Sequence, residues 1–146
     1  MSRDWRKTVR SAGAGWGAAR ALLGVMAITR PPSVSRPWIG EDAYTTGGTV
    51  FAKALGARDV ALGAGTVVAA LSGRGFPLWA LASAAADVGD TLATRQHWHE
   101  LPRTRMFIAA LAGGSAVAGT ALAVADAAGA MSGRCRETRS GENTAE

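Results

Sequence analysis

Charged residues are scarce in this chain and unevenly placed. Of its 146 residues, 18% are charged and 48% are hydrophobic. A soluble domain of this length normally surrounds a patterned core with a charged surface. Here the charges gather at the two ends and in connecting segments, and the long stretches between them carry few. This segregation favours a membrane protein over a soluble domain.

Cysteine, histidine and the common enzyme motifs are also nearly absent. The single cysteine, Cys135, excludes an intrachain disulfide and a cysteine-rich metal site. His97 and His99 form a His-x-His pair, but a metal site needs further ligands and the chain has no other histidine. There is no Gly-x-Gly-x-x-Gly, no P-loop and no Gly-x-Ser-x-Gly motif. We therefore expect no enzyme activity, no cofactor and no metal site.

Basic residues outnumber acidic ones, which gives a formal net charge of +5. A basic surface can indicate nucleic-acid binding, because it releases the counterions of phosphates. In this sequence, however, the basic residues flank apolar segments, where arginine and lysine anchor helices at lipid headgroups. We expect the lipid bilayer, and not nucleic acid, to be the partner.

The apolar segments predict an all-α fold, an antiparallel up-and-down four-helix transmembrane bundle. The predicted helices cover residues 12–29, 49–71, 78–94 and 106–130, in one domain of residues 1–131 followed by a disordered polar tail over 132–146. Residues 106–125 form the strongest span, because 20 uncharged residues cross about 30 Å of hydrocarbon at about 1.5 Å per residue.

The connections between these helices follow from proline, glycine and charge. Arg20 and the Pro31-Pro32 pair argue that the first segment is an uncleaved helix and not a signal peptide. Residues 31–46 are predicted to be a loop, whereas the short turn at 72–77 predicts a tight antiparallel hairpin.

The distribution of basic residues predicts the orientation in the bacterial inner membrane, with both termini in the cytoplasm. The predicted cytoplasmic set is Arg3, Arg6, Lys7, Arg10, Arg74, Arg134, Arg136 and Arg139. The smaller set on the opposite side is Arg30, Arg36, Lys53, Arg95, Arg103 and Arg105.

Five ionisable residues fall inside the predicted spans: Arg20, Arg58, Asp59, Asp87 and Asp90. An isolated charge there costs about 2.5–3.5 kcal/mol, so we expect the charges to pair. Counting residues from the cytoplasmic ends places all five at similar depths. We predict that Arg58 pairs with one or both helix 78–94 aspartates and that Asp59 turns towards Arg20.

Rows of small residues predict close helix packing, since lipid is as apolar as leucine and cannot drive helices together. These rows are Gly13 and Gly17; Ala57, Ala61, Gly65 and Ala69; and Ser115, Gly119, Ala123 and Ala127.

The stretch from Gly56 to Gly63 reads Gly-Ala-Arg-Asp-Val-Ala-Leu-Gly, and Arg20-Ala-Leu-Leu-Gly24 precedes it. With the aspartates at 87 and 90, residues 14–125 resemble a family of small four-helix bacterial membrane proteins grouped as a domain of unknown function. The resemblance implies a multipass fold and assigns no reaction. More distantly, the chain is similar to DoxX-type membrane proteins, some of which are linked to quinone redox complexes.

Two functions of a membrane protein remain open at this point, and a soluble helical bundle remains a third alternative. In the first, the charged cluster is a structural ion-pair network and the protein is an accessory or scaffold protein, as a homo-oligomer or in a larger membrane complex. In the second, the cluster is a polar site for a proton, ion or small ligand, and the protein is a minimal transporter or proton-coupled carrier.

Overall fold

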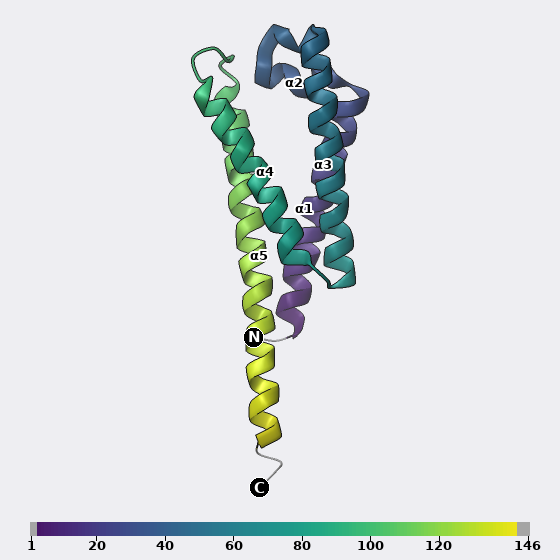
Figure 1. The fold of residues 1–146 in the computed structure, drawn as a ribbon, viewed down its shortest axis with the longest axis vertical. Coiled ribbons are helices and arrows are strands. Elements are labelled where there is room, and N and C mark those ends of the chain that lie inside the picture. Colours follow the sequence, from purple (N-terminus) through teal and green to yellow (C-terminus); the bar gives the residue numbers. More distant parts are fainter. Residues whose placement is uncertain (1–2, 143–146) are drawn as a thin grey trace.

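The computed structural model describes residues 3–142, and this part of the chain is helical with no strand. The helices, drawn in Figure 1, are α1 (Arg3–Thr29), α2 (Pro31–Ile39), the 3-10 helix η1 (Gly40–Tyr44), α3 (Thr46–Ser72), α4 (Phe76–Gln96) and α5 (Arg105–Glu142).

The long helices form two antiparallel pairs, α1 with α3 and α4 with α5. The pairs meet near the start of α1 and the α3–α4 turn, which we term the lower end, and diverge towards α2 and the α4–α5 loop, the upper end (Figure 1). Both α3 and α5 run from the upper to the lower end, and α4 returns the chain between them. The predicted hairpin therefore has a tight turn, but α4 packs mainly against α5 and less against α3.

The prediction of a four-helix transmembrane bundle is wrong. The described residues contain five α-helices, and only two of them are long and apolar enough to cross a membrane: Thr46–Ser72, which is α3, and Arg105–Ser132 within α5. Charged residues lower the hydropathy of the other two long helices: Arg20 and the charged first turns in α1, and Asp87, Asp90 and Arg95 in α4.

Most of residues 31–46, predicted to be a loop, instead forms α2 and η1. Pro31 and Pro32 occupy the first turn of α2, where a helix needs no backbone N–H donor and a fixed φ favours its start. The same prolines end α1, so they separate two helices instead of opening a loop. Gly40, with a φ of 66°, then ends α2.

The last helix extends beyond its predicted end at residue 130 and includes residues 132–142 of the predicted tail. No proline follows Met131, and α5 continues to Glu142. Residues 143–146 of the predicted tail lie outside the described residues.

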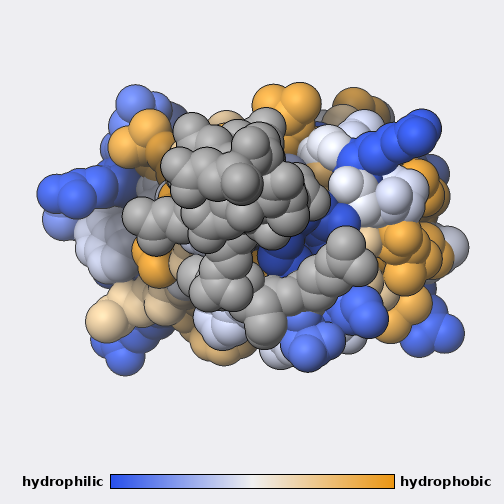
Figure 2. Space-filling model, turned by 90° about the horizontal axis from the view of Figure 1, so that it is seen from below, coloured by the Kyte–Doolittle hydropathy of each residue, from blue (hydrophilic) through white to orange (hydrophobic). Residues whose placement is uncertain are grey.

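The buried residues are mostly alanine and polar residues, whereas many large apolar side chains are exposed. The largest fully buried side chains are Phe76 and five polar residues: Thr66, Thr94, Asp126, Ser35 and Ser83. Large apolar side chains are exposed on all four long helices, for example Leu22, Val68, Leu78 and Val117. Viewed from the lower end, hydrophobic residues lie on the flanks next to hydrophilic ones (Figure 2).

Glycines set the distance between α1 and α3. A Cβ atom on Gly24 would lie 2.5 Å from the carbonyl oxygen of Gly56, and one on Gly17 would lie 2.8 Å from that of Gly63. The two backbones therefore touch at two levels, as in tightly packed membrane helices. The row of small residues predicted on α3 was partly wrong. Its members Ala57 and Ala61 are exposed, and the contacts with α1 are made by Gly56 and Gly63 instead.

We predict that Gly24→Ala destabilises the protein by roughly 1–3 kcal/mol, because the new methyl group meets backbone atoms that cannot move aside. The matched control is Gly15→Ala on the same helix, where a Cβ would have no neighbour within 4 Å. That control should stabilise the helix by about 0.5–1 kcal/mol. Unfolding in mild detergent, followed by circular dichroism, measures both, and equal effects would contradict the close contact.

Candidate functional site: a buried ion-pair network

The five ionisable residues singled out in the sequence lie together in the structure, and we term them the central network: Arg20 on α1, Arg58 and Asp59 on α3, and Asp87 and Asp90 on α4. They connect the α1–α3 pair to α4 through guanidinium–carboxylate contacts. Such contacts are charge-assisted hydrogen bonds, which are stronger than neutral ones.

Arg20 is the most buried basic group of the central network, with 7% of its surface exposed. Its Nη1 lies 2.8 Å from the Asp87 carboxylate and its Nη2 donates to Oδ1 of Asp59 at 2.9 Å. One guanidinium thus binds carboxylates from two helices. Its Nε, in contrast, is buried and has no hydrogen-bond partner.

The position of this contact follows from the glycine packing. Arg20 lies between Gly17 and Gly24, and Asp59 lies between Gly56 and Gly63, with the same spacing of three and four residues. Residues three and four apart share a helix face. The Arg20–Asp59 pair therefore lies between the two levels at which the backbones of α1 and α3 touch.

Arg58 joins α3 to α4. Its Nη1 and Nη2 donate to the two oxygens of Asp90 at 2.9 and 2.7 Å, a bidentate arrangement. Its Nε and Nη2 also donate to Oδ1 of Asp59, at 3.3 and 3.2 Å. Asp59 is thereby shared between the two arginines of the network.

The predicted pairings of Arg58 with an α4 aspartate and of Asp59 with Arg20 are confirmed. Of the two aspartates on α4, Arg58 binds only Asp90, since Asp87 binds Arg20. Matching the depths of charges along the helices found these pairs. Depth alone did not predict that Asp87 binds Arg20 of α1, because that contact depends on how far α4 diverges from α3.

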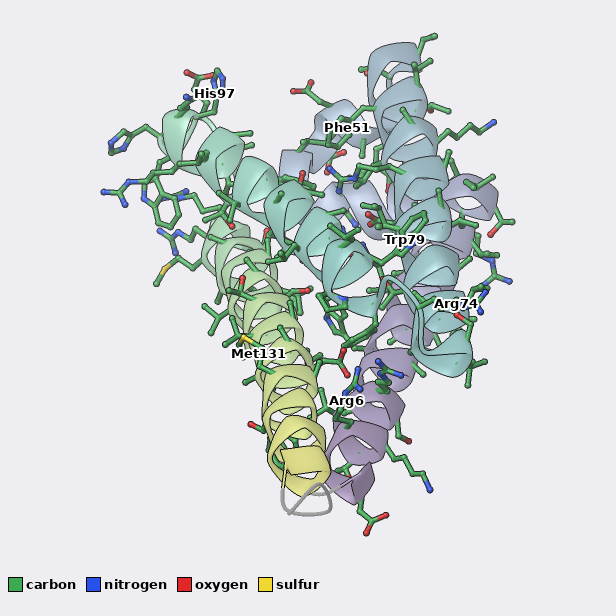
Figure 3. The ribbon with its side chains drawn as sticks, turned by 60° about the horizontal axis from the view of Figure 1, so that its bottom comes forward. Arg6, Phe51, Arg74, Trp79, His97 and Met131 are labelled. Atoms are coloured by element: carbon green, nitrogen blue, oxygen red, sulfur yellow. The ribbon has the colours of Figure 1, made fainter. Side chains whose placement is uncertain are left out.

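A second ion-pair cluster at the lower end was missed. Asp126 on α5 is 2% exposed and accepts hydrogen bonds from Arg10, at 2.8 and 3.2 Å, and from Arg6, at 3.3 and 3.4 Å. Arg6 extends from α1 towards α5 (Figure 3). The available signal was the four-residue spacing of the two arginines, which places them on one face of α1.

Tryptophan and threonine side chains add neutral contacts between the helices. Trp16 on α1 donates through Nε1 to Ser115 on α5 at 3.1 Å, and Trp38 on α2 donates to Thr94 on α4 at 3.0 Å. Buried indole N–H groups normally find such partners. Trp79 of α4 covers Gly65 of α3 where these helices cross (Figure 3).

The His-x-His pair lies at the upper end, and both side chains are exposed (Figure 3 labels His97). His97 contacts Glu100 at 3.3 Å. Among the side chains that the structure describes, no three of His, Cys, Asp or Glu gather closely enough to hold a metal ion.

An open pocket of about 580 Å³ also lies at the upper end, lined by α2, η1 and the α4–α5 loop. None of the five residues of the central network lines it.

No protein-family model, curated protein or solved structure matches the chain. The resemblance to four-helix bacterial membrane proteins therefore stays a prediction.

We predict that Arg20→Met destabilises the protein by roughly 3–5 kcal/mol, because it leaves the buried Asp87 carboxylate without a partner. The double variant Arg20→Met with Asp87→Leu should recover most of this loss. Arg36→Gln, which breaks an exposed pair with Glu41, is the control and should change stability by less than about 1 kcal/mol. Unfolding in mild detergent measures all three, and a double variant no better than the single would show that Arg20 does not act through Asp87.

Proposed function

We propose that this protein is an integral membrane protein that acts as a non-catalytic accessory or scaffold protein. The observation that carries the proposal is the placement of large and polar side chains: charged and hydroxyl groups are buried beside alanines between the helices, whereas most large apolar side chains face outward. Soluble domains bury their large apolar residues instead. A lipid environment makes this exterior favourable and makes paired charges inside necessary.

The two candidate spans support this environment. Residues 46–72 and 105–132 cross about 30 Å of hydrocarbon easily at about 1.5 Å per residue. Both run in the same direction, so the chain is expected to be multipass. The lower end carries Arg6, Lys7 and Arg10 near the start of α1 and Arg74 in the α3–α4 turn, and Figure 3 labels Arg6 and Arg74. We propose that this end faces the cytoplasm of the cell and that both termini lie there.

The accessory role is supported by the use of the charged groups. All five side chains of the central network bind one another across α1, α3 and α4. A network of this kind fixes the order and register of helices, which is the best-attested use of buried polar groups. We expect the protein to work as a homo-oligomer or as part of a larger membrane complex.

We predict that Val117→Lys reduces insertion of α5 into the membrane by about 2.5–3.5 kcal/mol, because this exposed position would place an ammonium group in the hydrocarbon. A glycosylation assay of helix insertion measures the change. His99→Lys, on the exposed upper loop, is the control and should insert like the natural protein. If α5 instead lay in water, both substitutions would change stability by less than about 0.5 kcal/mol and the chain would fractionate away from membranes.

We predict that the double variant Asp87→Asn with Asp90→Asn accumulates to a several-fold lower level in membranes. It leaves two guanidiniums against one carboxylate, and a loss of about 1–2 kcal/mol changes abundance several-fold. Asp42→Asn, at an exposed position, is the control. Immunoblotting of membrane fractions measures the level. Normal accumulation together with loss of a transport phenotype would instead favour the carrier function.

A further inference from the structure

Four basic side chains gather at the lower end, and we term them the lower basic cluster: Arg6, Lys7 and Arg10 in the first turns of α1, and Arg74 in the α3–α4 turn. Arg10 connects the two segments, because its Nη1 would lie 2.5 Å from a Cβ atom on Gly73, the residue before Arg74. Lys7 lies three residues from Arg10 and so shares a face of α1 with it. Figure 3 labels Arg6 and Arg74 at this end.

Acidic groups neutralise only part of the lower basic cluster. Asp126 accepts hydrogen bonds from the Nε and Nη2 groups of both Arg6 and Arg10. Among the residues that the structure describes, the Nη1 groups of these two arginines make no hydrogen bond, and the other two members of the cluster form no ion pair. The only further described carboxylate near the start of α1, Asp4, is exposed. Positive charge therefore remains for a ligand from outside the chain.

Strongly exposed apolar side chains adjoin the same cluster. Leu71 in the last turn of α3 and Leu78 in the first turn of α4 are 77% and 73% exposed, more than any other large hydrophobic residue described. Arg74 lies between them in the chain, three and four residues away. Trp5, at the start of α1, is 44% exposed, and tryptophan is typical of the headgroup level. Basic groups and hydrocarbon-like surface thus meet at this end, which suits an amphipathic ligand.

We propose that the lower basic cluster binds the headgroup of an anionic phospholipid whose acyl chains lie on Leu71 and Leu78. Arginine guanidiniums match the oxygens of a phosphate, and the available donors are Nη1 of Arg10 and the exposed side chain of Arg74. Lys7 adds a compact positive charge. A zwitterionic headgroup fits less well, because its ammonium group meets this positive charge. Free phosphate fits less well because it leaves the two leucines uncovered.

This inference rests on the proposed function, because the lower end meets lipid headgroups only if the helices cross a bilayer. The test is native mass spectrometry of the full chain, released from detergent micelles that contain equal amounts of phosphatidylglycerol and phosphatidylcholine. With the same acyl chains, these lipids differ in the charge of the headgroup. The natural protein should retain phosphatidylglycerol at least several-fold more than phosphatidylcholine.

The double variant Lys7→Gln with Arg74→Gln should weaken phosphatidylglycerol binding roughly 25-fold, since each basic residue near an anionic surface contributes about fivefold. Both side chains are exposed, so circular dichroism should show normal folding. The matched control is Lys53→Gln with Arg103→Gln, which removes the same charge from exposed positions of α3 and the α4–α5 loop. This control should bind the lipid like the natural protein.

Equal retention of the two lipids by the natural protein, or equal losses in the two double variants, would overturn the proposal. Inorganic phosphate at the concentration of the lipid should not displace phosphatidylglycerol. Complete displacement would assign the cluster to a free anion and overturn the lipid site. The insertion assay with Val117→Lys tests the membrane assignment separately, so a chain that inserts normally and shows no lipid preference contradicts the lipid site alone.

Discussion

The binding of Arg20 to carboxylates on two other helices constrains the rest of the structure. A buried guanidinium without partners is costly, so α3 and α4 must both present an aspartate at its level. This requirement fixes the axial register of α3 against α1 through Asp59, and that of α4 through Asp87. The glycines at the α1–α3 contact are needed for the same reason, because a wider separation would move Asp59 out of reach.

The network also explains how two helix pairs form one structure. The α1–α3 and α4–α5 pairs have extensive contacts within themselves, and fewer between them. Ion pairs join the two helix pairs at two levels. Arg20 and Arg58 bind the aspartates of α4 at mid-height, and Asp126 of α5 binds α1 at the lower end. At the upper end the connections are single neutral hydrogen bonds, from Trp38 to Thr94 and from Thr104 to the carbonyl of Pro37. We expect the upper end to separate more easily than the rest.

The sequence predicted helical structure and the main charge pairs because both depend on local spacing. Depths counted along each helix predicted that Arg58 pairs with one or both aspartates of α4 and that Asp59 pairs with Arg20, without knowledge of the fold. The number of spans was wrong because the placement of apolar and charged residues does not separate a membrane-crossing helix from one that packs beside it. The main partner of α4 was missed for a different reason: the short turn predicted that α4 packs against α3, whereas its main contacts are with α5, which lies far along the chain.

The spacing of those glycines carries a geometric consequence. Gly17 and Gly24 are seven residues apart, and so are Gly56 and Gly63. A seven-residue repeat is slightly shorter than two full turns of an ideal α-helix, so two helices that stay in contact through it wind around each other with a left-handed twist. A four-residue repeat of glycine instead favours a right-handed crossing. The α1–α3 contact therefore follows the coiled-coil pattern, with glycine in the place of leucine and an ion pair enclosed between successive contacts.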